Sequence, residues 1–162
     1  MKPTLTSVAT AVVALSMAAA AQADTKPRGA QLASPEKIAA AYSGKTDLWQ
    51  DNCGGGIYFS PNNLARAWCE KDADVVGAGT WSIDDAGRLC QKLNWYYPDS
   101  NGGAGKSEGE RNCINHVVDR WGKLWRNWPG DTEWWPVDSS SGLVRGYKFR
   151  SNVEQAESRA GL

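Results

Sequence analysis

The sequence lacks net charge and any close pair of cysteines, and each shortage excludes a class of function. Its 18 lysines and arginines balance its 18 aspartates and glutamates, so no general field attracts nucleic acid or other acidic polymers. None of the four cysteines is spaced as C-x-x-C, the spacing that zinc ribbons and redox motifs commonly use. We therefore expect no nucleic-acid partner, no metal site and no cofactor.

The chain also lacks a recognisable catalytic set. His116 is its only histidine, whereas a nucleophilic triad needs a base, a nucleophile and an orienting acid close together. No G-x-S-x-G motif singles out a serine, and a lone histidine in a strand is more often a half-buried structural side chain. Asp84 and Asp85 precede Gly87 in a predicted turn, where aspartate commonly makes local hydrogen bonds. We predict no catalytic residue.

Long hydrophobic runs are absent except at the N-terminus. Lys2 is followed by an almost unbroken run of Ala, Val, Leu and Met over residues 8–21, and Ala21-Gln22-Ala23 matches the pattern that signal peptidase cleaves. The run is shorter than the roughly 20 strongly apolar residues of a membrane span. We predict a cleaved signal peptide over residues 1–23, no transmembrane segment in the mature chain, and a periplasmic or secreted location.

The cysteines of the mature chain are Cys53, Cys69, Cys90 and Cys113. An even number in an exported chain predicts two disulfides, for which counting alone allows three connectivities. Residues 60–63 and 100–103 have the Pro, Asn and Gly composition of strand-reversing turns. The first turn lies midway between the first two cysteines, and the second lies midway between the last two. We therefore predict the disulfides Cys53–Cys69 and Cys90–Cys113.

The mature chain has the length of one domain. Residues 24–33 are polar and predict a flexible lead-in, residues 34–151 a single β domain, and residues 152–162 a C-terminal tail. Ser34-Pro35-Glu36 is typical of a helix start. Short strands then recur between turn residues, as in antiparallel barrels and sandwiches. We predict a mainly β fold, a small antiparallel β-barrel or sandwich with one short N-terminal helix and two cross-hairpin disulfides.

Residues 114–128 are compatible with two structures. Their apolar side chains fall at helical spacing, so one helix is possible. The β-branched and aromatic composition and the presence of Gly122 favour a strand, a turn at 119–122 and a second strand.

Several segments follow one another in an order found in a known family. They are Tyr42–Thr46, Ile57–Pro61, Gly79–Ile83, Gly87–Cys90, Cys113 and a Trp near the end. Over residues 35–150, the chain resembles the bacterial family named domain of unknown function 995. The resemblance implies an exported protein in which the Cys90–Cys113 pairing is shared and Cys53 and Cys69 are additions. The family has no established activity, so it implies no catalytic residues.

Tryptophan is abundant: the chain has nine, five of them between residues 121 and 135. Tryptophan supplies much core area in small β domains, and it also forms exposed binding faces. Cations alternate with these tryptophans, and this mixture suits both sugar rings and a membrane–water interface. The candidate ligand-binding residues are Trp121, Trp125, Trp128, Trp134, Trp135, Arg120 and Arg126.

The leading hypothesis is a non-catalytic binding or structural module of the cell envelope that recognises a glycan through the Trp-rich strands. Its expected partner is an envelope glycan or an envelope protein. One alternative is a secreted protease inhibitor of the small β-barrel type, with residues 24–33 as the inserting arm. Another alternative is an envelope hydrolase that uses His116 or exposed carboxylates.

Overall fold

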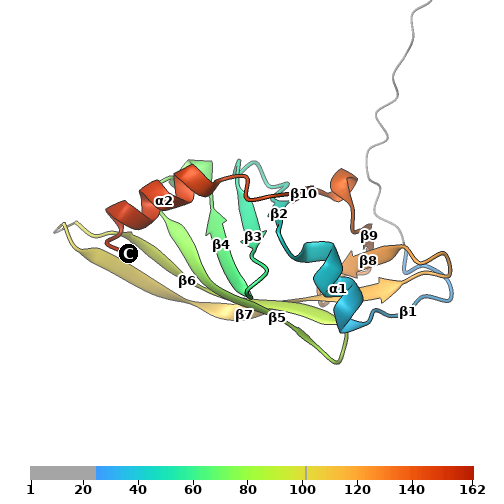
Figure 1. Cartoon of the computed structure of the whole chain (residues 1–162). Coiled ribbons are helices and arrows are strands. Elements are labelled where there is room, and N and C mark those ends of the chain that lie inside the picture. The colour runs from blue at the N-terminus through green and yellow to red at the C-terminus, as the bar shows by residue number, and fades with distance from the viewer. Residues whose placement is uncertain (1–24, 101) are drawn as a thin grey trace, which may run out of the picture.

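The computed structural model describes residues 25–100 and 102–162, and within them the strands form one antiparallel sheet curled into a half-barrel (Figure 1). The strand order is β10-β2-β3-β4-β5-β6-β7-β8-β9, and β1 pairs with β7 outside this path. The strands are β1 (Gln31–Leu32), β2 (Lys45–Leu48), β3 (Gly56–Phe59), β4 (Leu64–Trp68), β5 (Val76–Asp84), β6 (Arg88–Pro98), β7 (Ala104–Val118), β8 (Leu124–Asn127), β9 (Trp135–Pro136) and β10 (Leu143–Arg145). The predicted signal peptide lies outside the described residues.

Helix α1 (Pro35–Tyr42) packs against the inner face of the sheet at one end. Ser34 is its N-cap and accepts a hydrogen bond from the Lys37 amide at 3.3 Å, which satisfies one of the free donors at a helix start. Ile38 and Tyr42 are fully buried. They join an apolar core that fills the inside of the curl: Ala33, Ile38, Tyr42, Ile57, Phe59, Ala65, Ala67, Trp81, Leu89, Leu93, Leu124 and Leu143.

A second helix, α2 (Arg150–Arg159), covers the outer face of β4–β6 (Figure 1). The expectation of one helix was therefore incomplete, because residues 152–159 of the predicted tail lie in α2. Only Val153 and Ala156 are buried in this helix, so its apolar stripe is too short to stand out as a helical period. Arg66 of β4 donates to Glu157 of α2 at 2.7 Å and holds the helix in place. No helix of the described residues is long and apolar enough to cross a membrane.

Residues 114–128 form a strand, a turn and a strand, as their composition favours. Strand β7 continues to Val118, and β8 pairs with it only over residues 115–118. The Asp119 carboxylate orders the turn by accepting hydrogen bonds from the Trp121 and Lys123 amides and from the Trp125 indole.

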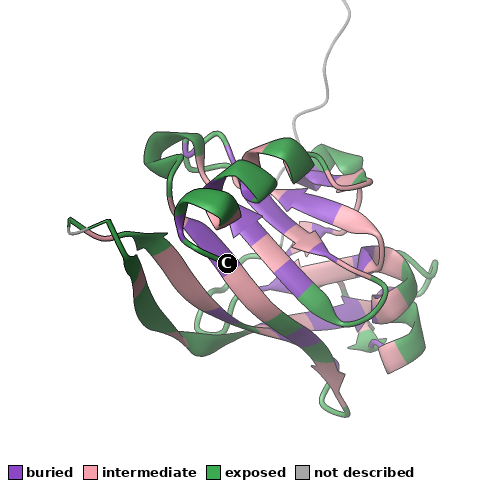
Figure 2. Ribbon diagram, turned by 60° about the vertical axis from the view of Figure 1, so that its left-hand side comes forward, coloured by how far each residue is buried: buried purple, intermediate pink, exposed green. Residues whose placement is uncertain are grey.

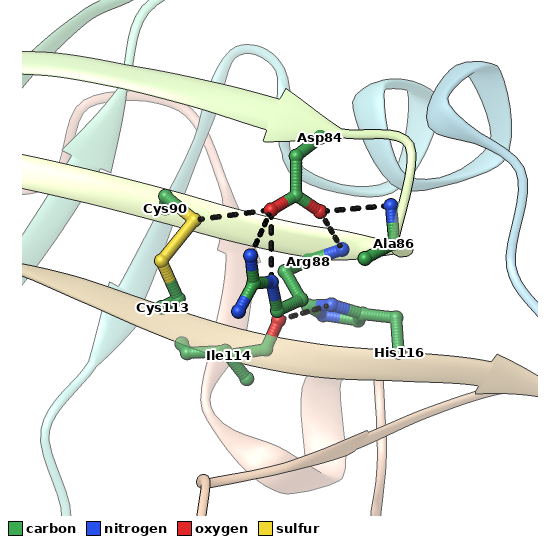
Figure 3. Close-up of a disulfide and its surroundings, with 7 residues drawn as sticks. All are labelled: Asp84, Ala86, Arg88, Cys90, Cys113, Ile114 and His116. Carbon is green, nitrogen blue, oxygen red and sulfur yellow. Dashed lines mark hydrogen bonds and ion pairs between the residues drawn. A yellow bond between two sulfur atoms is a disulfide. The ribbon is translucent and has the colours of Figure 1, made fainter.

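Both predicted disulfides are present. Cys90 and Cys113 lie directly opposite each other in β6 and β7 (Figure 3). Cys53 and Cys69, with Cα atoms 5.4 Å apart, join the segment before β3 to the residue after β4. The mainly antiparallel β fold with two cross-hairpin disulfides is thus confirmed, and the sheet curls as a half-barrel.

An ion pair inside the curl joins strands from the two ends of the sheet. Arg126 of β8 donates to the Asp47 carboxylate of β2, and its other terminal nitrogen donates to the Ser141 carbonyl at 2.8 Å. Ser141 ends the short helix η2 (Ser139–Ser141), which lies on the connection from β9 to β10. The two charged side chains are only 12% and 9% exposed. Burial raises the pKa of Asp47, against the opposite effect of Arg126.

Breaking this pair from one side should destabilise the fold. In the Arg126→Met variant the Asp47 carboxylate is buried without its partner, and we expect the free energy of unfolding to fall by about 3–5 kcal/mol. Combining Arg126→Met with Asp47→Leu removes both charges, so the double variant should recover most of that loss. Urea denaturation of the single and double variants measures the difference. If the loss of unfolding free energy in the double variant equals the sum of the losses in Arg126→Met and Asp47→Leu measured separately, this account is contradicted.

Candidate ligand-binding site

The end of the half-barrel opposite α1 is hollow. On β3, Phe59 lies at the α1 end, with its ring 5.3 Å from that of Tyr42, whereas Gly56 at the other end pairs with Leu48. Beyond Leu48 the chain enters a cavity of about 450 Å³. Its lining consists of Trp49, Asp51, Asp72, Val75, Trp95 and the Cys53–Cys69 disulfide.

Glycines position the Trp95 ring in the cavity wall. Trp95 of β6 lies directly opposite Gly77 of β5, and a Cβ on that glycine would lie 3.0 Å from the Trp95 ring. On the other side, Gly109 and Glu110 of β7 face the single residue Leu93 of β6, which is a β-bulge. A Cβ on Gly109 would lie 2.1 Å from the Leu93 carbonyl oxygen. The absence of a side chain at Gly77 therefore lets the Trp95 ring lie against the backbone of β5, where it forms part of the cavity wall.

Local hydrogen bonds hold the opposite wall of the cavity. The Trp49 amide donates to the Gly55 carbonyl at 3.0 Å. Asp51 accepts from the Cys53 amide at 3.1 Å, and the Glu70 amide donates to the Cys53 carbonyl at 3.1 Å. Together with the disulfide, these contacts fix the loop that carries Trp49 and Asp51.

The cavity offers aromatic faces, free donors and carboxylates. Within residues 25–100 and 102–162, the indole N–H groups of Trp49 and Trp95 make no hydrogen bond, and the Asp72 carboxylate has neither a hydrogen bond nor an ion pair. By contrast, the indoles of Trp68 and Trp81 donate to backbone carbonyls. No lysine, arginine or histidine lines the cavity. It can therefore stack on a ring and hydrogen-bond hydroxyl or amine groups, while its carboxylates repel anions.

A model of the family described as "Protein of unknown function (DUF995)" matches residues 10–147. The chain belongs to this family. No curated protein and no solved structure is detectably similar to it. Family membership supplies no activity and no functional residues.

The sequence-predicted residues of the DUF995 chain lie in several places. Arg120 and Trp121 occupy the β7–β8 turn, where the indole is 75% exposed and the guanidinium lies 4.1 Å from the ring centre. Trp128 follows β8 and is 44% exposed. The structure therefore brings Arg120 and Trp121 together at the surface, with Trp128 at the other end of β8.

The remaining candidates are committed to contacts within the fold. Trp125 donates its indole N–H to Asp119 at 3.0 Å. Trp134 is buried, and the Lys26 ammonium lies 5.6 Å from its ring centre. Trp135 is half-buried and lies opposite Arg126, whose guanidinium pairs with Asp47 inside the curl.

His116 has a structural environment. Its Nδ1 lies 3.0 Å from the Ile114 carbonyl oxygen, which can only accept, so Nδ1 carries the proton (Figure 3). Its Nε2 accepts from the Tyr42 hydroxyl at 2.8 Å. Burial lowers the pKa of His116 to about 4, and only 1% of the residue is exposed. The imidazole is neutral near pH 7 and does not contact the cavity. Asp84 likewise serves its own turn, accepting from the Ala86 and Arg88 amides (Figure 3).

The site residues predicted from the sequence do not include those of the cavity. Trp49, Asp51, Asp72 and Trp95 come from separate segments, and none has a motif around it. One signal of an aromatic site was present in the sequence. Trp95 and Tyr97 occupy alternate positions of the strand 88–98, and both neighbouring strands contain glycines.

The buried histidine should make stability depend on pH. Between pH 6.5 and about 4, the unfolded chain binds a proton at His116 that the folded chain does not. Stability should therefore fall as the pH decreases through this window, by at most about 1.4 kcal/mol per pH unit from this group. His116→Gln keeps an acceptor for Tyr42 and should lose this part of the slope. Urea midpoints measured between pH 7 and pH 4 test this, and equal slopes for both proteins would refute it.

Proposed function

We propose that this protein is a non-catalytic glycan-binding module of the cell envelope, and that its cavity holds a sugar ring between Trp49 and Trp95. The observation that carries the proposal is the pair of half-buried indoles with unpaired N–H groups beside the Asp51 and Asp72 carboxylates. A sugar presents C–H faces to aromatic rings and hydroxyls to polar groups. The volume of about 450 Å³ is typical of small-molecule sites, which span roughly 300–1,000 Å³.

An envelope or secreted location fits the chain's other features. The N-terminal apolar run with its small-residue cleavage pattern supports export. The two disulfides are compatible with an oxidising compartment. An envelope glycan is a ligand that such a protein meets in quantity.

The exposed residues of the Trp-rich segment form a second contact surface in this proposal. Trp121, with the Arg120 guanidinium against its ring, lies beyond the far end of β7 and can contact a distant part of a long polymer. Trp128 is also exposed. Affinity then comes chiefly from the cavity, because an indole on an open turn buries less area against a ligand.

The two alternatives have less support from the geometry. An inhibitory arm over residues 24–33 would need to be free, yet Gln31 and Leu32 pair with β7 and Ala33 is buried. A hydrolase that uses His116 would need substrate to reach an imidazole held between Tyr42 and Ile114.

Titration with neutral oligosaccharides, followed by tryptophan fluorescence, tests the proposal. We expect saturable quenching or a blue shift in the mature protein, and an affinity lowered about tenfold or more by Trp95→Ala or Asp72→Asn. Asp72 is exposed, so its substitution should preserve the fold. For short oligosaccharides, Trp121→Ala is the matched control, because the β7–β8 turn lies too far from the cavity for one such ligand to contact both. If Trp121→Ala abolishes binding while the cavity variants do not, the site lies on the β7–β8 turn and the cavity proposal is wrong.

The two disulfides should differ in their effect on binding. Replacing both Cys53 and Cys69 by serine should lower the unfolding free energy by roughly 2–4 kcal/mol and also weaken sugar binding, because this disulfide is part of the cavity wall. Replacing both Cys90 and Cys113 should lower stability similarly but leave affinity unchanged at a temperature where the protein stays folded. Thermal melts and titrations on both variants make the comparison, and equal losses of affinity would count against the proposed site.

A further inference from the structure

We infer that the cavity is the first subsite of an open aromatic track along the inner face of the β6–β7 hairpin, so that the ligand is a linear oligosaccharide. This inference rests on the proposed glycan binding. The track consists of Trp95 and Tyr97 with the small residues beside them, Gly77, Gly105 and Ser107. Alternate residues of a strand point to the same face, so Tyr97 continues the face that Trp95 presents to the cavity, about 6.6 Å further along.

Both rings lie over glycines in the neighbouring strands. Tyr97 lies directly opposite Gly105 of β7, and a Cβ on this glycine would lie 2.2 Å from the Tyr97 ring. Trp95 likewise lies directly opposite Gly77 of β5, and a Cβ on that glycine would lie 3.0 Å from the Trp95 ring. The two rings therefore lie against opposite neighbours of β6, each beside a residue without a side chain. In our proposal, these two rings stack on consecutive sugar residues.

The opposite face of the hairpin is braced by α2. Tyr96 points away from the track and packs in a cluster with Val153 and Ala156 of α2. Near the tip, a Cβ on Gly161 would lie in ordinary contact with Ala104, 3.5 Å away. Figure 2 shows the hairpin projecting from the body of the molecule, with exposed and half-buried residues towards its tip. The hairpin is thus supported from one side while Tyr97 remains 37% exposed.

The charge distribution narrows the class of glycan. Trp95, Tyr97 and Ser107 are uncharged, and the charged residues of the cavity are Asp51 and Asp72. Uronic acids and phosphorylated sugars would be repelled by these carboxylates. The track therefore suits a neutral chain or one that contains amino sugars.

A length series tests the track. We would titrate the mature protein with N-acetylglucosamine oligomers of one to six residues, with oligogalacturonate as the acidic comparison. Affinity should rise by about tenfold between the single sugar and the trimer and then level off, because each stacked ring adds contact area until the track is filled. Oligogalacturonate should bind more weakly at every length.

Two variants locate the effect. Tyr97→Ala should remove the gain with length while leaving the affinity for the single sugar unchanged, and Gly105→Val should do the same by lifting the Tyr97 ring. Lys106→Ala, on the opposite face beside Tyr96, is the matched control and should behave as the parent. Binding that is independent of chain length, or a length gain that survives Tyr97→Ala, overturns the track but leaves the cavity proposal standing. Binding of no oligomer, including the single sugar, overturns both.

Discussion

One buried ion pair joins the two ends of the curled sheet. Asp47 and Arg126 come from strands near the two ends of the strand order, and their contact brings those ends together inside the molecule. Apolar burial would favour many ways of folding a sheet over its own inner face, because the hydrophobic effect has no direction. By contrast, the hydrogen bonds from the Arg126 guanidinium to the Asp47 carboxylate and the Ser141 carbonyl are directional. We regard the pair as the contact that selects this curl among other compact arrangements.

The two ends of the half-barrel interior differ, because one is packed by α1 and the other contains the cavity. At the α1 end, Tyr42, His116 and Phe59 fill the space with aromatic contacts and one internal hydrogen bond. At the other end, the Trp95 ring lies against Gly77 and forms one wall of the cavity that Trp49, Asp51 and Asp72 also line. Stability is thus concentrated where the core is full, and the rim of the cavity is held by local cross-links.

Local chemistry explains what the sequence predicted, and long-range contacts explain what it did not. Both hairpins and both disulfides follow from the residues of the turns at which the strands reverse. The helix cap at Ser34 likewise follows from the residues next to it. The ion pair joins residues 79 positions apart, and Trp49 and Trp95 line one cavity only because the sheet curls. Helix α2 was missed because two buried residues do not make a visible period. Stacking of Trp95 on Gly77 is a property of strand register, which periodicity alone does not specify.

The length of β7 has a consequence for self-association. Since β8 pairs only with residues 115–118, the part of β7 from residue 104 to 114 has no strand on that side among the described residues, and such an edge can recruit a second molecule. Its sequence counters this: Lys106, Glu108, Glu110 and Arg111 place charges along it, and the bulge at Gly109 interrupts its hydrogen-bonding line. The outermost strands, β9 and β10, have only two and three residues. The bulge beside Trp95 and the charges along β7 thereby help to keep one molecule from adding its strands to the sheet of another.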